Sequence, residues 1–268
     1  MKSLEDVLAQ FTLFQKVLDR PEVLERVAFE VVEDCYREGT RKVELRFAPH
    51  FVAEYSQLHW DEILLSFEMG LKRALAKYPD MRAGLLCIAV RDFGTEGVAR
   101  AVEFFLAHQT RFAGLDLAGN EAGSNCKNYE RDFKKAIQAQ AKITIHAGEA
   151  AGPENIWEAI EYLGAQRIGH GIAAVQDLPL VERIRRDFIC LEMCPTSNWL
   201  TQAVLDLKKH PISKALELKL PVCINTDDPT IFGTTLPNEV KVSKNQIGLT
   251  QSQIDLCFRN ADQASFLS

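Results

Sequence analysis

Short apolar runs and longer amphipathic stretches alternate along the chain from one end to the other. In the first amphipathic stretch, residues 4–18, apolar side chains recur at the spacing of one helix face. A second predicted helix opens with Pro21 in its first turn and closes at Gly39. The other predicted helices cover residues 61–78, 95–108, 129–141, 153–163, 179–186, 211–218 and 237–267. The short apolar runs predict strands at residues 42–47, 84–90, 112–117, 142–146, 167–170, 188–193 and 221–226.

Strands that alternate with helices in this way predict a parallel sheet with helices outside it. In an open sheet the ligand crevice draws on a few strands near the switch point, whereas a barrel mouth draws on every strand. Polar residues stand at or just past the end of nearly every predicted strand, namely Arg46, His50, Asp116, Asn120, His146, Glu149, His170, Glu192, Cys194, Asp227 and Asp228. This favours a barrel mouth.

The predicted fold is therefore α/β, a (β/α)8 TIM-type barrel. Such a barrel needs eight strands, and seven are recognisable, so one strand is unaccounted for. No linker, repeat or low-complexity segment interrupts the chain, and residues 1–268 are predicted to form a single domain.

Composition narrows the partners and the compartment. The formal charge is −6, with 31 Lys and Arg against 37 Asp and Glu, and no basic run suggests nucleic acid or an anionic membrane as a partner. The longest apolar stretch, residues 83–90, is far short of the roughly 20 residues that span a bilayer. Residues 1–10 contain no apolar core of a secretory signal. Seven cysteines without Cys-x-x-Cys spacing predict reduced packing residues in a cytoplasmic protein.

The segment 143–149 offers a histidine and a carboxylate at one strand end. His146 could bind a metal through one ring nitrogen, and Glu149, beyond a flexible Ala-Gly, could act as an acid or base over the same mouth. The alternative is structural: His146 bonded to a backbone carbonyl, and Glu149 capping the helix that begins at Pro153. These residues alone leave both readings open.

Three further segments contain candidate groups. His170 stands between glycines that would let the backbone pass close to a ligand, although a structural histidine would also fit there. The adjacent carboxylates Asp227 and Asp228 follow an apolar strand and need a positive or hydrogen-bonding partner, or else form a capping turn before Pro229. Gly119 could bring its N–H to a ligand, but a tight loop is the favoured reading. His59, His108 and His210 are predicted to be surface groups, and His50 could support a site from behind.

Four motifs in chain order give the sequence a specific resemblance. His-Ala-Gly-Glu at 146–149, Arg-Ile-Gly-His-Gly at 167–171, Cys-Pro-Thr-Ser-Asn at 194–198 and Asn-Thr-Asp-Asp-Pro at 225–229 resemble the adenosine deaminase family, and Leu-Asp-Leu-Ala-Gly at 115–119 agrees. The resemblance implies a (β/α)8 barrel with zinc at its C-terminal mouth. It also implies hydrolytic removal of the 6-amino group of adenosine or deoxyadenosine, which yields the inosine product and ammonia in purine salvage.

The resemblance implies a role for each motif residue. His146 and Asp227 would bind zinc, Glu149 would donate a proton to purine N1, and Gly119 would give its N–H to purine N3. His170 would position the attacking water and help to deprotonate it, and Asp228 would hydrogen-bond that water and purine N7. This chemistry is coherent because a metal lowers the pKa of water from about 15.7 to about 7, and an acid facing the ring offsets the charge that develops on it.

The chain also departs from the family pattern. Family members begin with a strand that ends in His-x-His, which supplies two zinc ligands, and no His-x-His occurs here. We therefore expect either most of an adenosine deaminase, shortened at the N-terminus and slightly at the C-terminus, or a short homologue that binds purine nucleosides without zinc or turnover. A third expectation is a deaminase of adenine or another 6-aminopurine. An opened barrel would expose two strand edges, through which the chain could self-associate.

Overall fold

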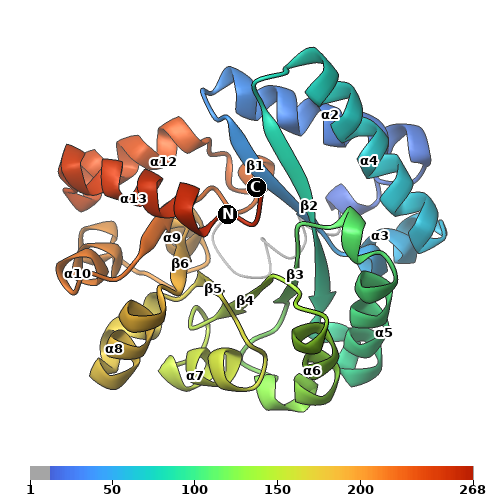
Figure 1. Ribbon diagram of the computed structural model, residues 1–268. Helices are drawn as coiled ribbons and strands as arrows, with labels where there is room; N and C mark the ends of the chain where they lie inside the picture. The colour runs from blue at the N-terminus through green and yellow to red at the C-terminus, as the bar shows by residue number, and fades with distance from the viewer. Residues whose placement is uncertain (1–12, 268) are drawn as a thin grey trace.

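The computed structural model describes residues 13–267, in which a parallel sheet curls on itself and helices pack around its outside (Figure 1). Its seven strands follow one another in chain order, and each pairs in parallel with the next. The strands are β1 (Lys42–Phe47), β2 (Arg82–Val90), β3 (Gly114–Ala118), β4 (Ile143–Ala147), β5 (Arg167–His170), β6 (Cys190–Met193) and β7 (Val222–Ile224). The curled α/β sheet with seven strands confirms the predicted fold class.

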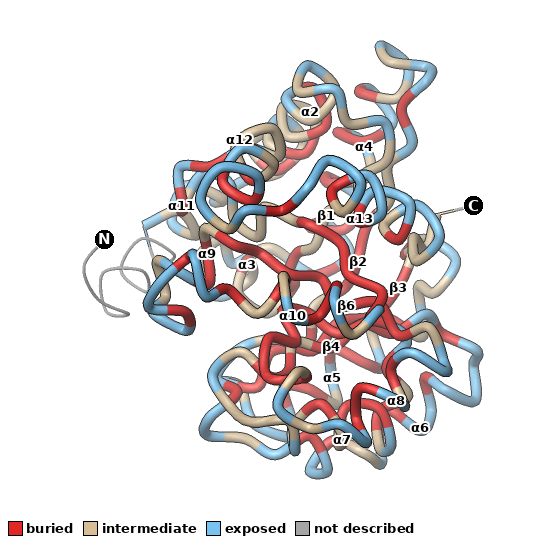
Figure 2. The backbone as a smooth tube through the Cα atoms, turned by 90° about the vertical axis from the view of Figure 1, so that its left-hand side faces the viewer, coloured by how far each residue is buried: buried red, intermediate tan, exposed pale blue. Residues whose placement is uncertain are grey.

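The helices cover the outer face of the sheet, and the strands form the buried centre (Figure 2). The α-helices are α2 (Pro21–Arg37), α3 (Pro49–Ser56), α4 (Trp60–Lys77), α5 (Gly94–Ala107), α6 (Glu130–Gln138), α7 (Pro153–Glu161), α8 (Leu178–Asp187), α9 (Pro195–Leu200), α10 (Ile212–Glu217), α11 (Pro229–Phe232), α12 (Leu236–Val242) and α13 (Gln251–Ala264). Short 3₁₀ turns lie at Arg91–Phe93, Gln109–Arg111, Cys126–Tyr129, Ile172–Gln176 and Leu207–Lys209.

The helix predictions were wrong in two ways. Helices α3, α9 and α11 were not predicted, because each begins at a proline soon after a strand and is too short to show a clear helical period. The final stretch, 237–267, is not one helix: a π-helical segment, Ser243–Ile247, and Gly248 in the left-handed region separate α12 from α13. The first predicted helix, 4–18, lies largely outside the described residues.

The two ends of the sheet are not paired with each other among the described residues. Strand β1 is half-buried along most of its length, whereas every residue of β7 is buried. Helix α13 covers β7, and Asn260 Nδ2 donates to the Val222 carbonyl at 3.0 Å. At β1, Glu44 Oε1 accepts hydrogen bonds from Ser265 Oγ at 2.8 Å and from the Phe266 N–H at 2.6 Å. The last residues of the described chain thus hydrogen-bond to groups of both terminal strands, β1 and β7.

Charged side chains point into the curled sheet and pair there. Arg46 donates to Asp116 at 2.9 Å and to Glu192 at 2.8 Å, and Arg167 lies 3.0 Å from Glu192 and 2.6 Å from Glu44. Burial alone would raise the pKa of Glu192, but the two arginines outweigh it and lower the pKa to about 2. The ion pairs therefore keep Glu192 charged inside the sheet.

None of the helices in the described part of the chain has both the length and the apolar character needed to cross a membrane.

We predict that Glu192→Gln lowers the free energy of unfolding by about 3–5 kcal/mol at pH 7, because it leaves buried charge on the arginines uncompensated. The folded-state pKa lies below the unfolded value of 4.5, so the carboxylate's contribution is present above that pH and is lost as the pH falls toward 2. Urea denaturation should therefore show a difference between the two proteins that is smaller at pH 3.5 than at pH 7, by about 1.4 kcal/mol per pH unit below 4.5.

Glu130→Gln is the control, because Glu130 pairs with Lys134 on the surface of α6 at 2.8 Å. This exchange should cost under about 1 kcal/mol. Equal losses for the two variants would contradict the stabilising role of the interior ion pairs.

Candidate active site

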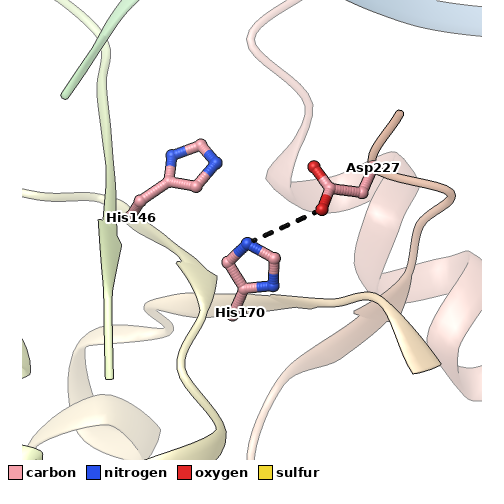
Figure 3. Close-up of side chains that lie close together, drawn as sticks. All are labelled: His146, His170 and Asp227. Atoms are coloured by element: carbon pink, nitrogen blue, oxygen red, sulfur yellow. Dashed lines mark ion pairs between the residues drawn. The ribbon is translucent and has the colours of Figure 1, made fainter. Parts of the chain in front are cut away.

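Three candidate residues from three different strand ends meet at the mouth of the sheet (Figure 3). His146 lies in β4, His170 ends β5 and Asp227 follows β7. One ring nitrogen of each histidine and one carboxylate oxygen of Asp227 all lie within 4.8 Å of one another. Because parallel strands bring their carboxyl ends to one edge, residues 81 positions apart in sequence become neighbours (227 − 146).

The backbone is strained at two of these residues. His170 and Asp227 both have a φ of 59°, in the left-handed region that non-glycine residues avoid. Such a conformation persists only where the surroundings impose it, and it is concentrated at functional sites. Gly169 contributes in another way, because a Cβ there would lie 3.0 Å from Cγ of His146. The missing side chain at 169 makes room for the His146 ring.

His146 is oriented by a fully buried carboxylate. Its Nδ1 lies 3.0 Å from Asp116 Oδ1, and the other oxygen of Asp116 accepts from Arg46. Burial disfavours both charges, but the attraction between the two groups raises the pKa of His146 and, together with Arg46, lowers the pKa of Asp116. In the neutral ring Nδ1 donates to Asp116, which leaves the Nε2 lone pair available to a ligand.

The paired aspartates after β7 have different surroundings. Asp227 Oδ2 accepts a hydrogen bond from Ser197 Oγ at 2.7 Å, and its side chain is 21% exposed. Burial, and then the charge of Asp227, raises the pKa of Asp228 to about 7. Asp228 occupies the N-cap position of α11, but its side chain makes no cap hydrogen bond. The segment therefore leads into α11, as the alternative reading expected, but the Asp228 side chain does not act as the cap.

Glu149 reaches the same cluster from the loop after β4. Its Oε1 accepts from Asn198 Nδ2 at 2.8 Å and from Thr201 Oγ1 at 3.2 Å, and its Oε2 lies 3.4 Å from His170 Nε2. The predicted alternative, a cap for α7, is wrong, because Gly152 holds that position without a side-chain cap. The carboxylate is held at one oxygen and presents the other to His170.

A second glutamate fixes the backbone of the Glu149 loop. The carboxylate of Glu121, which is 7% exposed, accepts the N–H groups of Gly148, Glu149 and Ala150. The bonds from Glu149 and Ala150 are 3.0 and 2.8 Å long. Three backbone donors that converge on one buried carboxylate make a rigid anchor.

Gly119 lies directly after β3, at the same edge of the sheet. Its φ is 95°, and a Cβ at this position would lie 2.1 Å from Asp92 Oδ2. Asp92 Oδ2 also accepts the N–H of Asn120 at 2.9 Å, which ties the ends of β2 and β3 together. Asn120 in turn accepts the N–H of Gly123, so the favoured tight-loop reading describes this segment correctly. The role of Gly119 toward a ligand stays a prediction.

Of the histidines that were expected at the surface, two lie there and one, His210, does not. His59 is exposed and His108 pairs with Asp61 at 2.9 Å on the outer side, as expected of surface groups. His210 was expected at the surface and is 2% exposed, because the turn before α10 folds inward against α9. His50 stacks on Phe93 with ring centroids 3.5 Å apart and lies outside the His146 cluster.

Four residues of the site, Glu121, Ser197, Asn198 and Thr201, were not predicted from the sequence. Ser197 and Asn198 were visible only as part of a motif, and Glu121 only as a neighbour of Gly119. Their contacts with Asp227 and with Glu149 connect separate strand ends, so no local pattern could have indicated them.

The donor set fits a divalent metal of the zinc type. Zinc in enzymes takes imidazole nitrogen and carboxylate oxygen, and His146 and Asp227 offer one of each with their other atoms already engaged. His170 is within the same cluster. The site therefore has the composition of a metal centre beside an acid, Glu149.

Comparison with known proteins agrees with this geometry. The profile of the adenosine deaminase family matches residues 1–268. The chain belongs to the adenosine deaminase family. It is 40% identical over 253 residues to adenosine deaminase of Escherichia coli O1:K1, an alignment that covers 94% of this chain and 76% of the relative. It is thus a hydrolase of the kind that acts on C–N bonds.

Solved structures with the same fold include other deaminases. Adenine deaminase from Arthrobacter aurescens superposes with a TM-score of 0.93 at 24% identity, over 100% of this chain and 81% of that one. N6-methyl-AMP deaminase from Arabidopsis thaliana superposes with a TM-score of 0.87 at 25% identity, over 100% and 80%. An amidohydrolase from Burkholderia ambifaria with bound zinc superposes at 0.87 and 22% identity, over 93% and 70%.

We predict that Glu121→Ala lowers kcat/KM of this family member by about 100-fold, because a displacement of Glu149 by an ångström has an effect of that size. Steady-state deamination rates and circular dichroism would be measured together. Glu154→Ala on the exposed first turn of α7 is the control and should leave the rate unchanged. A folded Glu121→Ala protein with the full rate would show that the anchor does not matter.

Proposed function

We propose that the site hydrolyses adenosine, and deoxyadenosine, to the inosine product and ammonia, as a zinc-dependent step of purine salvage. The observation that supports this most is the convergence of His146, His170, Asp227 and Glu149 at one mouth in a chain that is 40% identical to an adenosine deaminase. In this reaction water adds to C6 of the purine and the 6-amino group leaves.

Glu149 is the proton donor in this proposal. Negative charge develops on the purine as water attacks, and a proton delivered to N1 offsets it. Oε1 is held by Asn198 and Thr201, so Oε2 is the oxygen that faces the ring nitrogen. Glu121 binds the backbone of the Glu149 loop and thereby fixes the position of the Glu149 carboxylate at the mouth.

His170 and Asp228 hold the attacking water, and Gly119 and Asp228 hold the purine. Asp228, whose pKa is raised by burial and by Asp227, can accept from water and face purine N7. The amide of Gly119 at the end of β3 is directed to purine N3.

His146 and Asp227 would hold the metal. A bound zinc ion supplies a lowered pKa to water, so that a nucleophile forms near neutral pH. Asp116 orients His146 for this task, and Ser197 orients Asp227. We place the protein in the cytoplasm because its seven cysteines are unpaired thiols, six of them buried.

Two alternatives remain distinct from this proposal. A related structure at 25% identity is an N6-methyl-AMP deaminase, which makes other 6-aminopurines candidate substrates. The chain could also bind purine nucleosides without turnover, because two protein ligands are fewer than the three that a catalytic zinc has.

We predict that the purified chain, supplied with zinc, deaminates adenosine faster than adenine or AMP, and that Glu149→Gln lowers kcat by at least about 100-fold with little change in KM. Loss of absorbance at 265 nm would follow the reaction. Faster turnover of adenine or AMP would show that adenosine is not the preferred substrate. If none of the three is deaminated, the result would support binding without turnover.

A second measurement tests the metal. Asp227→Asn should reduce the zinc retained after dialysis, measured by mass spectrometry of the metal, because an amide oxygen is a weaker ligand than a carboxylate. Asp206→Asn on the surface is the control. Zinc retention that is the same in both variants would exclude Asp227 as a ligand.

A further inference from the structure

Asn198 lies at the centre of the hydrogen bonds behind the site. It is fully buried, and its amide contacts three groups: Glu149 Oε1 at 2.8 Å, His170 Nδ1 at 3.0 Å and His210 Nε2 at 3.2 Å. Its backbone is held within α9 and the turn after it, by the Cys194 carbonyl and by the Val204 N–H. The side chain therefore bridges its three partners from a fixed backbone.

A backbone N–H decides which atoms donate and which accept in these hydrogen bonds. The N–H of Ile212 can only donate, and it points at His210 Nδ1 at 3.1 Å. Nδ1 of His210 is therefore an acceptor. Burial, and then the neighbouring His170, lowers the pKa of His210 to about 4, so the ring is neutral near pH 7. Its one proton is on Nε2, which donates to Asn198 Oδ1.

Glu149 requires the same orientation of the Asn198 amide. A carboxylate only accepts, so the atom 2.8 Å from Oε1 is the Nδ2 of Asn198. His210 requires Oδ1 of Asn198 to face it, and Glu149 requires Nδ2 to face it, so both partners impose the same orientation on the amide. Nδ2 has a second hydrogen, and its second neighbour is His170 Nδ1.

We propose that His210 and Asn198 are positioning residues that hold His170 as the neutral tautomer with its proton on Nε2. His170 Nε2 faces the mouth, 3.4 Å from Glu149 Oε2 and 4.0 Å from Asp227 Oδ2. In this state His170 donates a hydrogen bond into the mouth and has no lone pair there. It orients the water by donating to it and, with its proton already on Nε2, does not take up the proton of the water, contrary to the role that the family resemblance implied.

The same tautomer separates His170 from the metal ligands. A metal on Nε2 would need that lone pair while Nδ1 accepts from Asn198, which would require a doubly deprotonated ring. His146 has the opposite arrangement, since Asp116 takes its Nδ1–H and leaves Nε2 bare. Of the two imidazoles in Figure 3, His146 is thus the ligand and His170 the hydrogen-bond donor.

The closing experiment reads the tautomer directly. The full chain would be labelled with ¹⁵N-histidine, and the ring nitrogens of its six histidines would be recorded by NMR near pH 7, with His170 and His210 assigned by substitution. We expect both residues to show a bare Nδ1 and a protonated Nε2. A proton on Nδ1 of His170 would overturn the proposal.

Substitutions at two positions, Asn198 and His210, test the cause. Asn198→Asp replaces the donor by a second acceptor, so the His170 proton should appear on Nδ1. His210→Phe should leave His170 as a mixture of tautomers, and His210→Gln, whose amide can still donate to Asn198, should restore the wild-type pattern. His108→Gln, on the outer face, is the control and should change nothing at His170. If His170 kept its proton on Nε2 in both Asn198→Asp and His210→Phe, the proposal that Asn198 and His210 set its tautomer would be overturned.

The consequence for turnover rests on the proposed function and is measured separately. His210→Phe should lower kcat for adenosine by about 10–100-fold with KM little changed, and His210→Gln should recover most of it, as for other residues that orient a ligand from behind. Absence of deamination in the wild-type chain would refute the proposed function and leave the NMR result standing. A normal kcat in His210→Phe with altered tautomers would overturn the positioning role.

Discussion

A polar side chain that points into a curled sheet must find its partner there, because little water reaches it. This constraint explains the chain of ion pairs that runs through the interior, formed by Glu44, Arg167, Glu192, Arg46 and Asp116. One end of the chain meets the C-terminal residues through Glu44, and the other end orients His146 through Asp116. The packing inside the curled sheet and the orientation of the candidate metal ligand His146 therefore depend on the same chain of ion pairs.

At the mouth, buried polar groups are likewise satisfied, here by hydrogen bonds rather than by ion pairs with arginine. Asn198 satisfies Glu149, His170 and His210 at once, and each partner limits which way the amide can point. Glu121 does the same for the backbone of the Glu149 loop. His170 and Asp227 have φ values that are unfavourable for non-glycine residues. Hydrogen bonds from side chains outside the strand ends hold them in this conformation.

Particular elements show how far sequence patterns reach. The seven strands were predictable because buried parallel strands are short apolar runs between helices. Helices α3 and α9 were not, because six to eight residues after a proline show too little periodicity. His146, His170 and Asp227 could be nominated from their strand ends, whereas His210 looked like a surface residue, since burial of a turn depends on what folds over it.

The sequence by itself determined the family, the sheet, and the residue types available for hydrolysis, because these depend on periodicity and on motifs whose members are close in the chain. Only the tertiary structure decided which groups orient which. The distance from Asn198 to Glu149 spans 49 positions, and that from Arg46 to Glu192 spans 146. Hydrogen bonds have a direction and a length of about 3 Å, so tautomers, anchors and buried ion pairs exist only once distant strand ends meet.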